Sequence, residues 1–362
     1  MIIAHVVEPF ATGINTFIHE LVFGMPEYQH CIIHGERKDT REIETIKKEY
    51  LGKATFIKWE HAHRDINLKM DIKACLQLHK ILKKIDFDIL HLHSSKAGVI
   101  GRAIGYLNGY KNVIYTPNGA SFLRKDIPKN KIIRYQRIEK NFSRLNAKVI
   151  SSSESEFKAH AELDIKSKII QNGVLVNQTI HPKPKDNTLN IVTCGKITIQ
   201  KDPAFLNQIA NFFKDNPDIS FKWIGDGELR HELSNVEVTG WCSKEEVFHH
   251  LSQADLYIST SSWEGLPFAG IEAMAFKLPL LMHDCVGNND LVNPGINGYI
   301  FDSRVKAIED IEYLKENRNI LQFLAENSIK MYDRHYNNFR CAKEYNDLYK
   351  AFYRKTKIAT AN

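Results

Sequence analysis

Short apolar runs alternate along the chain with segments whose apolar positions recur at helical spacing. In the first half the runs are IIAHVV (2–7), CIIH (31–34), TFIKW (55–59), ILHLH (89–93), NVIYT (112–116), KVISS (148–152) and KIIQN (168–172). In the second half they are NIVTC (190–194), FKWIG (221–225), VEVTG (236–240), DLYIST (255–260) and LPLLM (278–282). Such runs between helices are typical of buried parallel strands. The pattern predicts an α/β protein with two doubly wound, Rossmann-like domains.

A polar segment separates the two series of runs. Leu175 to Asn190 reads LVNQTIHPKPKDNTLN, with two prolines and no apolar periodicity, which is typical of a linker. We therefore expect one domain over residues 1–175 and a second over 185–335. A further long helix, rich in aromatic residues, is expected from Asn337 to Lys355.

Capping residues mark three helix starts in the second domain. Asp202 precedes Pro203, which suits an N-cap followed by a first-turn proline. Ser243 is followed three residues later by Glu246, as in a capping box, and Pro267 precedes another helical pattern. Ligands of doubly wound folds bind beyond the carboxyl ends of the strands, where such helices begin. The sequence therefore predicts the chemistry at these turns.

The strongest functional pattern is WEGLPFAGIEAMA at 263–275, which follows a predicted strand. The first amides of a helix lack internal partners, and the helix dipole favours negative charge there. We therefore expect the amides of Phe268, Ala269 and Gly270 to face an anionic ligand. Because glycine has no side chain, Gly270 would also let that ligand approach the backbone closely.

Two carboxylates bracket this anion site. Glu264 lies in the loop before the helix, and Glu272 lies about one turn into it. Carboxylates accept hydrogen bonds, so the pair suits the hydroxyls of a sugar and of a ribose. An acid that only complements the helix dipole would explain Glu272, but not Trp263-Glu264-Gly265 in an apolar surround.

Other turns at the same predicted sheet edge carry lysines and glycines. The segment GKITIQKDP at 195–203 places Lys196 and Lys201 between a strand end and a capped helix. Together with helix amides, two lysines would neutralise a diphosphate, although a lone lysine is more often a solvated surface charge. The glycine-containing turns expected near phosphate, base or acceptor are Gly195, Gly225-Asp226-Gly227, Gly240-Trp241-Cys242 and Thr12-Gly13.

Composition restricts the class of protein. The six cysteines form no CxxC pair, which argues against a zinc module or a disulfide framework and suits a cytoplasmic protein. The start MIIAHVVEPF does not resemble a signal peptide, and no stretch approaches the ~20 apolar residues of a membrane span. The net charge of +6 comes without a recognition motif, so we expect no nucleic-acid partner.

Two patterns have the spacing of metal ligands but favour other interpretations. Asp86-Phe87-Asp88 has the D-x-D spacing of metal-dependent transferases, yet it lies in a turn before a predicted strand, where acids are usually solvated. His91 and His93 share one face of that strand, but the sequence places no third ligand beside them. We therefore expect no catalytic metal and no other cofactor.

Residues 124–148 carry nine basic and two acidic side chains, with Ile132, Ile133, Tyr135 and Phe142 interspersed. A helix of this kind can dock on anionic lipid. Docking would make the protein peripheral on the inner face of the cell membrane. A solvated helix face is the alternative that the sequence leaves open.

Together these motifs resemble the family 4 retaining glycosyltransferases, which have the GT-B fold. The Glu264/Glu272 pair, with seven residues between, matches that family's E-x7-E motif, and Lys196 and Lys201 match its basic pair. The likeness covers nearly the whole chain, although its second half is the specific part. Further similar segments are SSKAG (94–98), YTPNG (115–119), IQNGV (170–174), VGNNDLV (286–292) and GINGY (295–299).

The resemblance implies a role for each matched charge. Glu264, with the amides after it, would hold the donor sugar. Glu272 would accept hydrogen bonds from ribose hydroxyls, while Lys196 and Lys201 would hold the diphosphate. These roles describe a nucleotide-sugar donor bound by the second domain.

The resemblance also assigns the base and the domain arrangement. Trp241 or Cys242 would contact the base through backbone atoms. The family's last helix packs on the N-terminal domain, so residues from about 340 to 362 would belong to that domain, which faces the acceptor. The donor would lie in a cleft between the two domains.

One position departs from the family pattern. Relatives often have histidine where this chain has Asn118, next to Pro117. Asparagine donates and accepts hydrogen bonds but carries no proton at neutral pH. Asn118 is therefore a candidate for contact with the donor sugar, and direct proton transfer by this residue is not expected.

The resemblance implies a metal-independent hexosyltransferase. It would move a hexose or N-acetylhexosamine, with retention, from a nucleotide-diphosphate sugar to a hydroxyl of a lipid-linked surface glycan such as lipopolysaccharide or capsule. A UDP-sugar is favoured only by its frequency in the family. The sequence leaves open a nucleotide-sugar epimerase of similar fold and a non-catalytic sugar-nucleotide binding protein.

Overall fold

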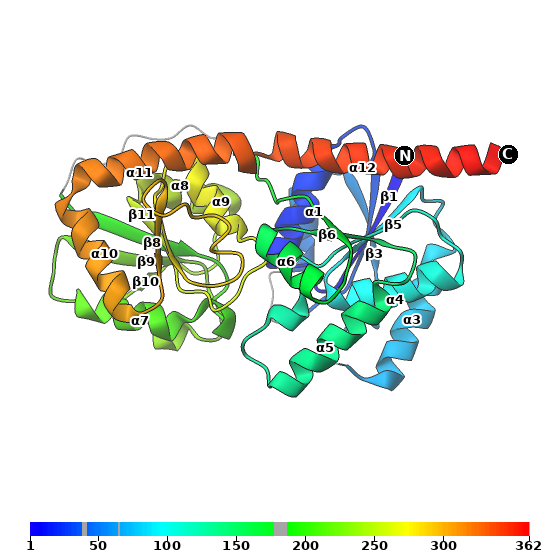
Figure 1. The fold of residues 1–362 in the computed structure, drawn as a ribbon, viewed down its shortest axis with the longest axis horizontal. Coiled ribbons are helices and arrows are strands. Elements are labelled where there is room, and N and C mark those ends of the chain that lie inside the picture. Colours follow the sequence, from blue (N-terminus) through cyan, green and yellow to red (C-terminus); the bar gives the residue numbers. More distant parts are fainter. Residues whose placement is uncertain (38–41, 64–65, 177–186, 362) are drawn as a thin grey trace. The chain divides into compact units, whose positions relative to one another are not determined.

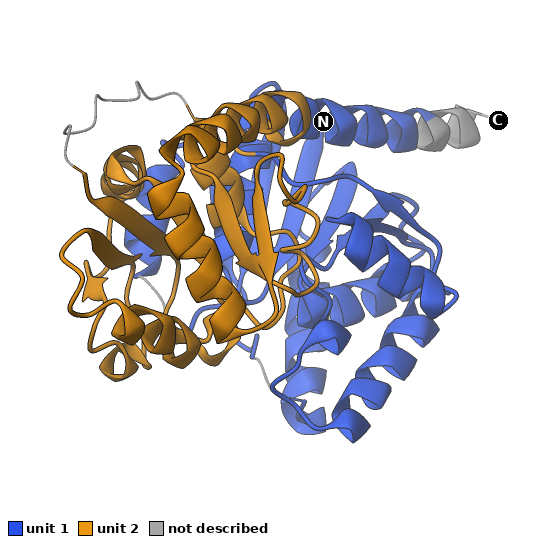
Figure 2. Ribbon diagram, turned by 60° about the vertical axis from the view of Figure 1, so that its left-hand side comes forward, with its two compact units in different colours: residues 1–173, 338–362 blue, residues 174–337 orange. Residues whose placement is uncertain are grey.

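The computed structural model describes residues 1–37, 42–63, 66–176 and 187–361, with side chains up to residue 354. The chain forms two compact units, each with its own sheet (Figure 1, Figure 2). Unit 1 comprises Met1–Gly173 and Asn338–Asn362, and unit 2 comprises Val174–Asn337. Most of the expected linker lies outside the described residues.

The sheet of unit 1 has seven parallel strands in the order β3-β2-β1-β4-β5-β6-β7. Its strands are β1 (Ile2–Val7), β2 (Gln29–His34), β3 (Ala54–Lys58), β4 (Ile89–His93), β5 (Val113–Thr116), β6 (Lys148–Ser151) and β7 (Ser167–Ile169). Its helices are α1 (Thr12–Gly24), α2 (Ile43–Glu49), α3 (Leu68–Leu82), α4 (Ser95–Leu107), α5 (Lys129–Phe142), α6 (Glu154–Glu162) and α12 (Asn338–Ala361), with a short 3-10 turn at Ser121–Leu123.

The alternation of side chains along β4 shows how helices cover the two faces of this sheet. Leu90 and Leu92 pack in the core that α3 and α4 share with the strands. His91 and His93 point to the opposite face, where Phe17 of α1 contacts both rings. Figure 1 shows α3, α4 and α5 side by side on the first face, and α1 packs against α12 on the second.

The sheet of unit 2 has six parallel strands in the order β10-β9-β8-β11-β12-β13. Its strands are β8 (Leu189–Cys194), β9 (Ile219–Ile224), β10 (Glu237–Val238), β11 (Leu256–Ser259), β12 (Leu280–His283) and β13 (Gly298–Phe301). Its helices are α7 (Pro203–Phe212), α8 (Lys244–Gln253), α9 (Phe268–Ala275), α10 (Arg304–Glu316) and α11 (Arg318–Met331), with short turns at Ile199–Lys201, Arg230–Glu232 and Tyr332–Tyr336.

The predicted elements are largely confirmed. All twelve apolar runs contribute strands, and β13 is an additional strand that the pattern did not predict. Asp202 caps α7 by accepting a hydrogen bond from Phe205 N at 3.1 Å, Ser243 forms a capping box with Glu246, and Pro267 directly precedes α9. In the described part of the chain, no helix is both long enough and apolar enough to span a bilayer.

Candidate active site

The candidate residues of unit 2 lie on loops at one edge of its sheet. All six strands are parallel, so the loops that follow them emerge at the same, carboxyl edge. Residues 195–202 follow β8, and residues 260–267 follow its neighbour β11. The lysines and Glu264 therefore lie on adjacent loops.

Lys201 and Glu264 form an ion pair across these two loops. Nζ of Lys201 lies 2.7 Å from Oε1 of Glu264, and the two side chains are 18% and 10% exposed. Burial, the largest single effect, lowers the pKa of Lys201, but the Glu264 carboxylate, together with Tyr257 and Cys194, outweighs it and raises the pKa above its ordinary value. Lys201 therefore keeps its positive charge at neutral pH.

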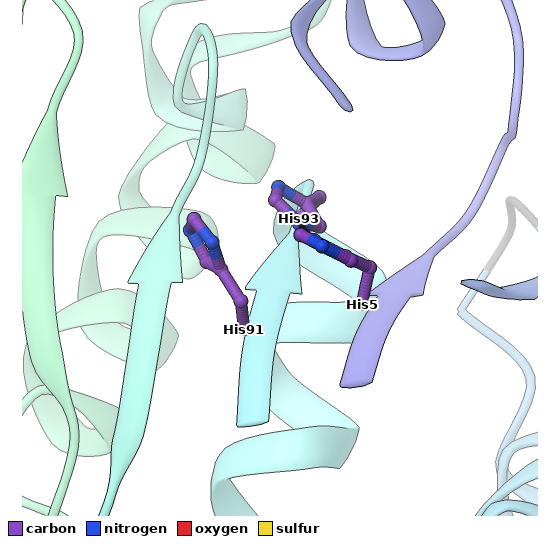
Figure 3. Close-up of side chains that lie close together, drawn as sticks. All are labelled: His5, His91 and His93. Carbon is purple, nitrogen blue, oxygen red and sulfur yellow. Dashed lines mark hydrogen bonds between the residues drawn. The ribbon is translucent and has the colours of Figure 1, made fainter. Parts of the chain in front are cut away.

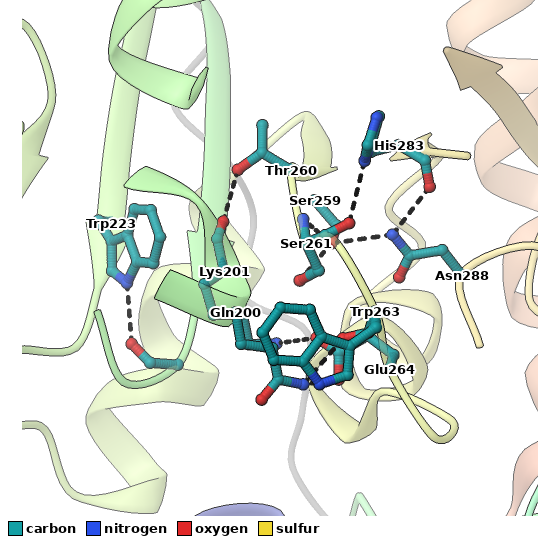
Figure 4. Close-up of polar contacts among 11 residues, drawn as sticks. Gln200, Lys201, Trp223, Ser259, Thr260, Ser261, Trp263, Glu264, His283 and Asn288 are labelled. Carbon is teal, nitrogen blue, oxygen red and sulfur yellow. Dashed lines mark hydrogen bonds and ion pairs between the residues drawn. The ribbon is translucent and has the colours of Figure 1, made fainter. Parts of the chain in front are cut away.

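Further hydrogen bonds fix the two loops against each other (Figure 4). Gln200 Nε2 donates to Trp263 O at 2.9 Å and to Oε2 of Glu264 at 3.2 Å. Thr260 Oγ1 donates to the backbone oxygen of Lys201 at 2.8 Å. The ion pair is thus held in place before any ligand binds. Neither Gln200 nor Thr260 was predicted, because no local motif marks a contact between separate loops.

Glu272 lies close to the same group of charges. It is buried in the second turn of α9. Burial raises the pKa of the Cys194 thiol at the end of β8; the negative charge of Glu272 raises it further, and the positive charge of Lys201 opposes both. Lys196 is half-buried two residues after Cys194. The four charged candidates therefore share one edge of the sheet.

The turn after β9 approaches the end of β8 more closely than any side chain would allow. Gly225 has φ +138°, and a Cβ there would lie 2.3 Å from the backbone oxygen of Gly195. Trp223 Nε1 donates to that same oxygen at 2.8 Å. Gly225 N donates to Thr239 Oγ1 at 3.1 Å, which ties the turn to the end of β10. Both Gly225 and Gly195 thus belong to the edge that carries the charges.

The remaining predicted turns of unit 2 join the same edge. Ile197 N donates to the backbone oxygen of Asp226 at 2.9 Å, which links the loops after β8 and β9. Cys242 Sγ donates to Thr239 Oγ1 at 3.2 Å, while the indole of Trp241 is 48% exposed. The contact of Trp241 or Cys242 with a base stays a prediction.

The structure gives Gly270 a packing role, while the predicted approach of a ligand stays a prediction. A Cβ at Gly270 would lie 2.7 Å from both Met282 Cε and Leu291 Cδ1. The glycine is therefore explained by tight packing of α9 inside the unit, and ligand approach is not needed to explain it. Its N–H also donates to Pro267 O at 3.1 Å, so this amide is engaged. Phe268 and Ala269 remain candidates for binding an anion at the start of α9.

In unit 1, Asn118 lies in a turn that other residues hold. Its φ is +54°, a conformation that asparagine tolerates better than most residues. Glu156 accepts hydrogen bonds from Gly119 N and Ala120 N, both at 2.9 Å, and from Ser152 N at 2.7 Å. Within the described residues, the buried Oδ1 and Nδ2 atoms of Asn118 have no hydrogen-bond partner. A polar ligand would satisfy them.

Gly13 is the second residue of α1, just beyond the carboxyl end of β1. The residue before this helix, Ala11, provides no side-chain cap. The Asp86-Phe87-Asp88 segment, which has D-x-D spacing, lies at the opposite edge of the sheet. Asp88 precedes β4, and its Oδ2 accepts a hydrogen bond from Ile2 N at 2.8 Å. That contact supports a structural role for Asp88.

A third histidine joins the two that were seen in the sequence (Figure 3). His5 of β1 pairs in register with His91 of β4, and nitrogens of His5, His91 and His93 lie within 4.8 Å of one another. With His30 of β2, these residues form what we call the histidine cluster. All four are buried. Burial lowers the pKa of each ring, so the cluster is neutral at neutral pH.

The cluster forms a chain of hydrogen bonds whose direction is fixed at one end. His30 Nε2 must donate to Met25 O, at 3.1 Å, because a carbonyl only accepts. His30 Nδ1 then accepts from His5 Nε2, and His5 Nδ1 accepts from His93 Nε2, each at 3.0 Å. A metal ion would have to displace these bonds in a cluster without a carboxylate. We therefore interpret the histidines as a packed polar core.

Comparison with known proteins identifies the family. Residues 188–317 match the family described as glycosyl transferases group 1, and residues 40–153 match the one described as glycosyl transferase 4-like. The chain is a group 1 glycosyltransferase. This assignment favours a transferase over the epimerase and the non-catalytic binding protein.

Two curated relatives of the transferase come from Escherichia coli. The UDP-Gal:alpha-D-GlcNAc-diphosphoundecaprenol alpha-1,3-galactosyltransferase is 28% identical over 268 residues, which cover 66% of this chain and 68% of the relative. The O-antigen biosynthesis glycosyltransferase WbnH is 29% identical over 278 residues, which cover 72% of this chain and 80% of the relative.

Solved structures show that the transferase has the GT-B fold. Anabaena Alr3699/HepE in complex with UDP and glucose gives a TM-score of 0.76 at 14% identity, with 97% of this chain and 100% of that chain covered. The lipopolysaccharide outer core galactosyltransferase WaaB gives 0.68 at 16% identity, with 97% and 99% covered. At these identities the likeness establishes the fold alone.

Proposed function

We propose that the transferase moves a hexose or N-acetylhexosamine from a UDP-sugar to a hydroxyl of a lipid-linked glycan during surface-polysaccharide assembly. The observation that carries the donor half of this proposal is the Lys201–Glu264 ion pair, with Glu272 and Lys196 at the same sheet edge. The acceptor half draws on relatives whose names specify a diphosphoundecaprenol acceptor and O-antigen biosynthesis.

The proposed roles follow from charge and hydrogen-bonding capacity. Lys201 and Lys196 would neutralise the diphosphate, because a positive charge at the leaving group stabilises the transition state. Glu264, already fixed by Lys201 and Gln200, would accept hydrogen bonds from the sugar. Glu272 would accept them from the ribose. Asn118 would pair its two unsatisfied amide atoms with hydroxyls of the sugar.

The proposed step breaks the bond between the anomeric carbon and the β-phosphate oxygen. A bond from the acceptor oxygen to that carbon forms on the same face, so the configuration is retained. The proton of the acceptor hydroxyl passes to the departing phosphate oxygen. Positive charge on Lys201 stabilises that oxygen while charge develops on it. The step requires no carboxylate nucleophile of the kind that retaining glycosidases use.

The proposed location is the inner face of the cell membrane. All six cysteines are free thiols, which suits a reducing compartment, and a lipid-linked acceptor would lie at the membrane surface. The basic segment 124–148 supports docking on anionic lipid.

Product analysis tests this function. The transferase would be incubated with UDP-galactose, UDP-glucose or UDP-N-acetylhexosamines and a short-chain lipid diphosphate that carries one sugar. We expect mass spectrometry to find one added sugar, and NMR to find the donor's anomeric configuration in the new linkage. Lys201→Ala should abolish most of the turnover. Donor consumption without an acceptor product, or near-normal turnover of that variant, would contradict the proposal.

A further inference from the structure

The positive charge of the chain is concentrated on three neighbouring helices of unit 1. Helices α3, α4 and α5 carry ten lysine and arginine residues against two acidic ones, a net +8, whereas the whole chain has +6. The remainder of the chain is therefore slightly acidic. An excess confined to one layer of helices indicates a negatively charged partner for that layer.

The two acidic residues of this layer form ion pairs between its own helices. Asp71 of α3 pairs with Lys96 of α4 at 2.5 Å. Glu139 of α5 pairs with Arg102 of α4 through two hydrogen bonds of 2.8 and 3.1 Å. Both pairs connect neighbouring helices, which Figure 1 shows side by side. The layer is therefore a pre-formed surface.

Seven cations remain on its outer side. They are all exposed, and none forms an ion pair with another residue that the structure describes. They are Lys69, Lys73, Lys80, Lys129, Lys131, Arg134 and Arg137. Because none of this charge is neutralised within the described chain, it is available to an external anionic surface.

Large apolar side chains are exposed on the same helices. Of the 17 strongly exposed large hydrophobic side chains in the described residues, seven lie on α3, α4 and α5, which contain 15, 13 and 14 residues. They are Leu68, Met70, Ile72, Leu76, Tyr106, Leu107 and Ile133. A concentration of this kind marks an interaction surface, whereas single exposed residues do not.

Helix α3 shows how charge and apolar surface are combined. Ala74, Leu78 and Leu82 form the stripe that packs on the sheet. On the outer side, Ile72 and Leu76, 52% and 57% exposed, lie among lysines at positions 69, 73 and 80. A helix with one buried stripe has no folding reason for a second apolar stripe in water. Apolar side chains flanked by lysines suit the boundary between lipid headgroups and acyl chains.

We propose that the outer face of α3, α4 and α5 rests on an anionic lipid bilayer, with the exposed apolar side chains inserted between headgroups. This face extends the basic segment 124–148 and adds the exposed apolar side chains of α3 and α4 to Ile133 of α5. A nucleic acid would use the cations but leave Leu76 and Leu107 in water, so a bilayer fits the whole surface better. The biological use of the docking rests on the proposed function, because a lipid-linked acceptor lies in that bilayer.

Flotation with vesicles tests the proposal without donor or acceptor. Vesicles of phosphatidylcholine alone, or mixed with phosphatidylglycerol, would be centrifuged with the wild type and three variants. The charge variant is Lys73→Gln/Arg134→Gln/Arg137→Gln, and the apolar variant is Ile72→Ser/Leu76→Ser/Leu107→Ser. The control is Phe212→Ser/Phe323→Ser, which alters exposed residues of unit 2. Thermal unfolding would establish that each variant folds.

We expect the wild type and the control to bind mixed vesicles at least tenfold better than neutral ones, and less at high salt. Both surface variants should lose at least tenfold of this binding. Unchanged binding of the apolar variant, or equal binding of the wild type to both vesicle types, would overturn the proposal. Turnover of a water-soluble short-chain acceptor should be the same in all four proteins. If the wild type shows no turnover of this acceptor, the proposed function is contradicted, but the vesicle result is unaffected.

Discussion

Breaking the Lys201–Glu264 pair provides a quantitative test of how the site is built. Lys201→Met removes the charge and keeps most of the aliphatic chain, while Glu264→Gln removes the opposite charge and keeps the shape. The pair is 2.7 Å apart, with side chains 18% and 10% exposed. Each single change therefore leaves one largely buried charge without its counter-charge, and the double variant leaves none.

The expected energies follow from this burial. Removing one partner of a buried pair costs about 3–5 kcal/mol. The Gln200 bond of 3.2 Å partly compensates the Glu264 charge that Lys201→Met leaves behind, so we expect about 2–3 kcal/mol for that variant and about 3–5 kcal/mol for Glu264→Gln, in which Lys201 loses its counter-charge. The double variant should cost less than the sum of the singles by about 2 kcal/mol, which is the coupling energy of the pair.

Urea unfolding monitored by tryptophan fluorescence measures these energies. Trp223, Trp241 and Trp263 all lie in unit 2, so the signal reports mainly the unit that holds the pair. The control is Lys222→Met, which breaks the more exposed Lys222–Glu237 pair, 3.3 Å apart, and should cost about 0–1 kcal/mol. A coupling energy for Lys201–Glu264 below about 0.5 kcal/mol, the additivity limit, would refute the reasoning.

Three further changes test other parts of the account. Gly225→Ala should destabilise unit 2 by roughly 2–4 kcal/mol, because alanine is strained at φ +138° and its Cβ meets the Gly195 oxygen; a loss below about 1 kcal/mol in urea unfolding would contradict this. Gly270→Ala should destabilise unit 2 by about 1–3 kcal/mol through overpacking against Met282. If the glycine serves packing, the affinity for UDP measured by calorimetry should change less than threefold. A tenfold loss of UDP affinity would indicate a role in ligand binding. The pKa values of the histidine cluster are lowered in the folded state. Unfolding therefore takes up protons at any pH below the ordinary histidine pKa of about 6.5. Stability should be full above that pH and fall as the pH drops from about 7 to 5, and a His91→Phe variant should show a shallower fall; equal unfolding free energies of the wild type at both pH values would exclude the effect.

The fold was largely predictable because the strands of both sheets are short, apolar and separated by helices. The missed strand, Gly298–Phe301, is only four residues long, and two of these residues are half-buried. A Cβ at Gly298 would lie 1.9 Å from the Leu280 oxygen, so the glycine that lowers strand propensity is required by close strand packing. Local sequence does not reveal such crowding.

The site was predictable where one local rule sufficed. Turns at strand ends placed Lys201 and Glu264 at one edge, because parallel strands share that edge. The bond from Gln200 to Glu264 depends on which loops are adjacent, and the meeting of His5 with His91 depends on strand register. For Gly270 the prediction named only a ligand, whereas the structure shows that Met282 and Leu291 already leave no room for a side chain there. A glycine in a sequence does not show which neighbour excludes its side chain.

The central claim is that the carboxyl edge of the second sheet binds a nucleotide diphosphate through Lys201. Calorimetric titration with UDP tests it most directly, using the wild type, Lys201→Met and the control Lys222→Met at a temperature where all three are folded. The account predicts binding to the wild type and the control, and at least tenfold weaker binding to Lys201→Met, a loss of about 1.4 kcal/mol or more. Equal affinity in all three proteins, or no binding of UDP, GDP or ADP to the wild type, would contradict it.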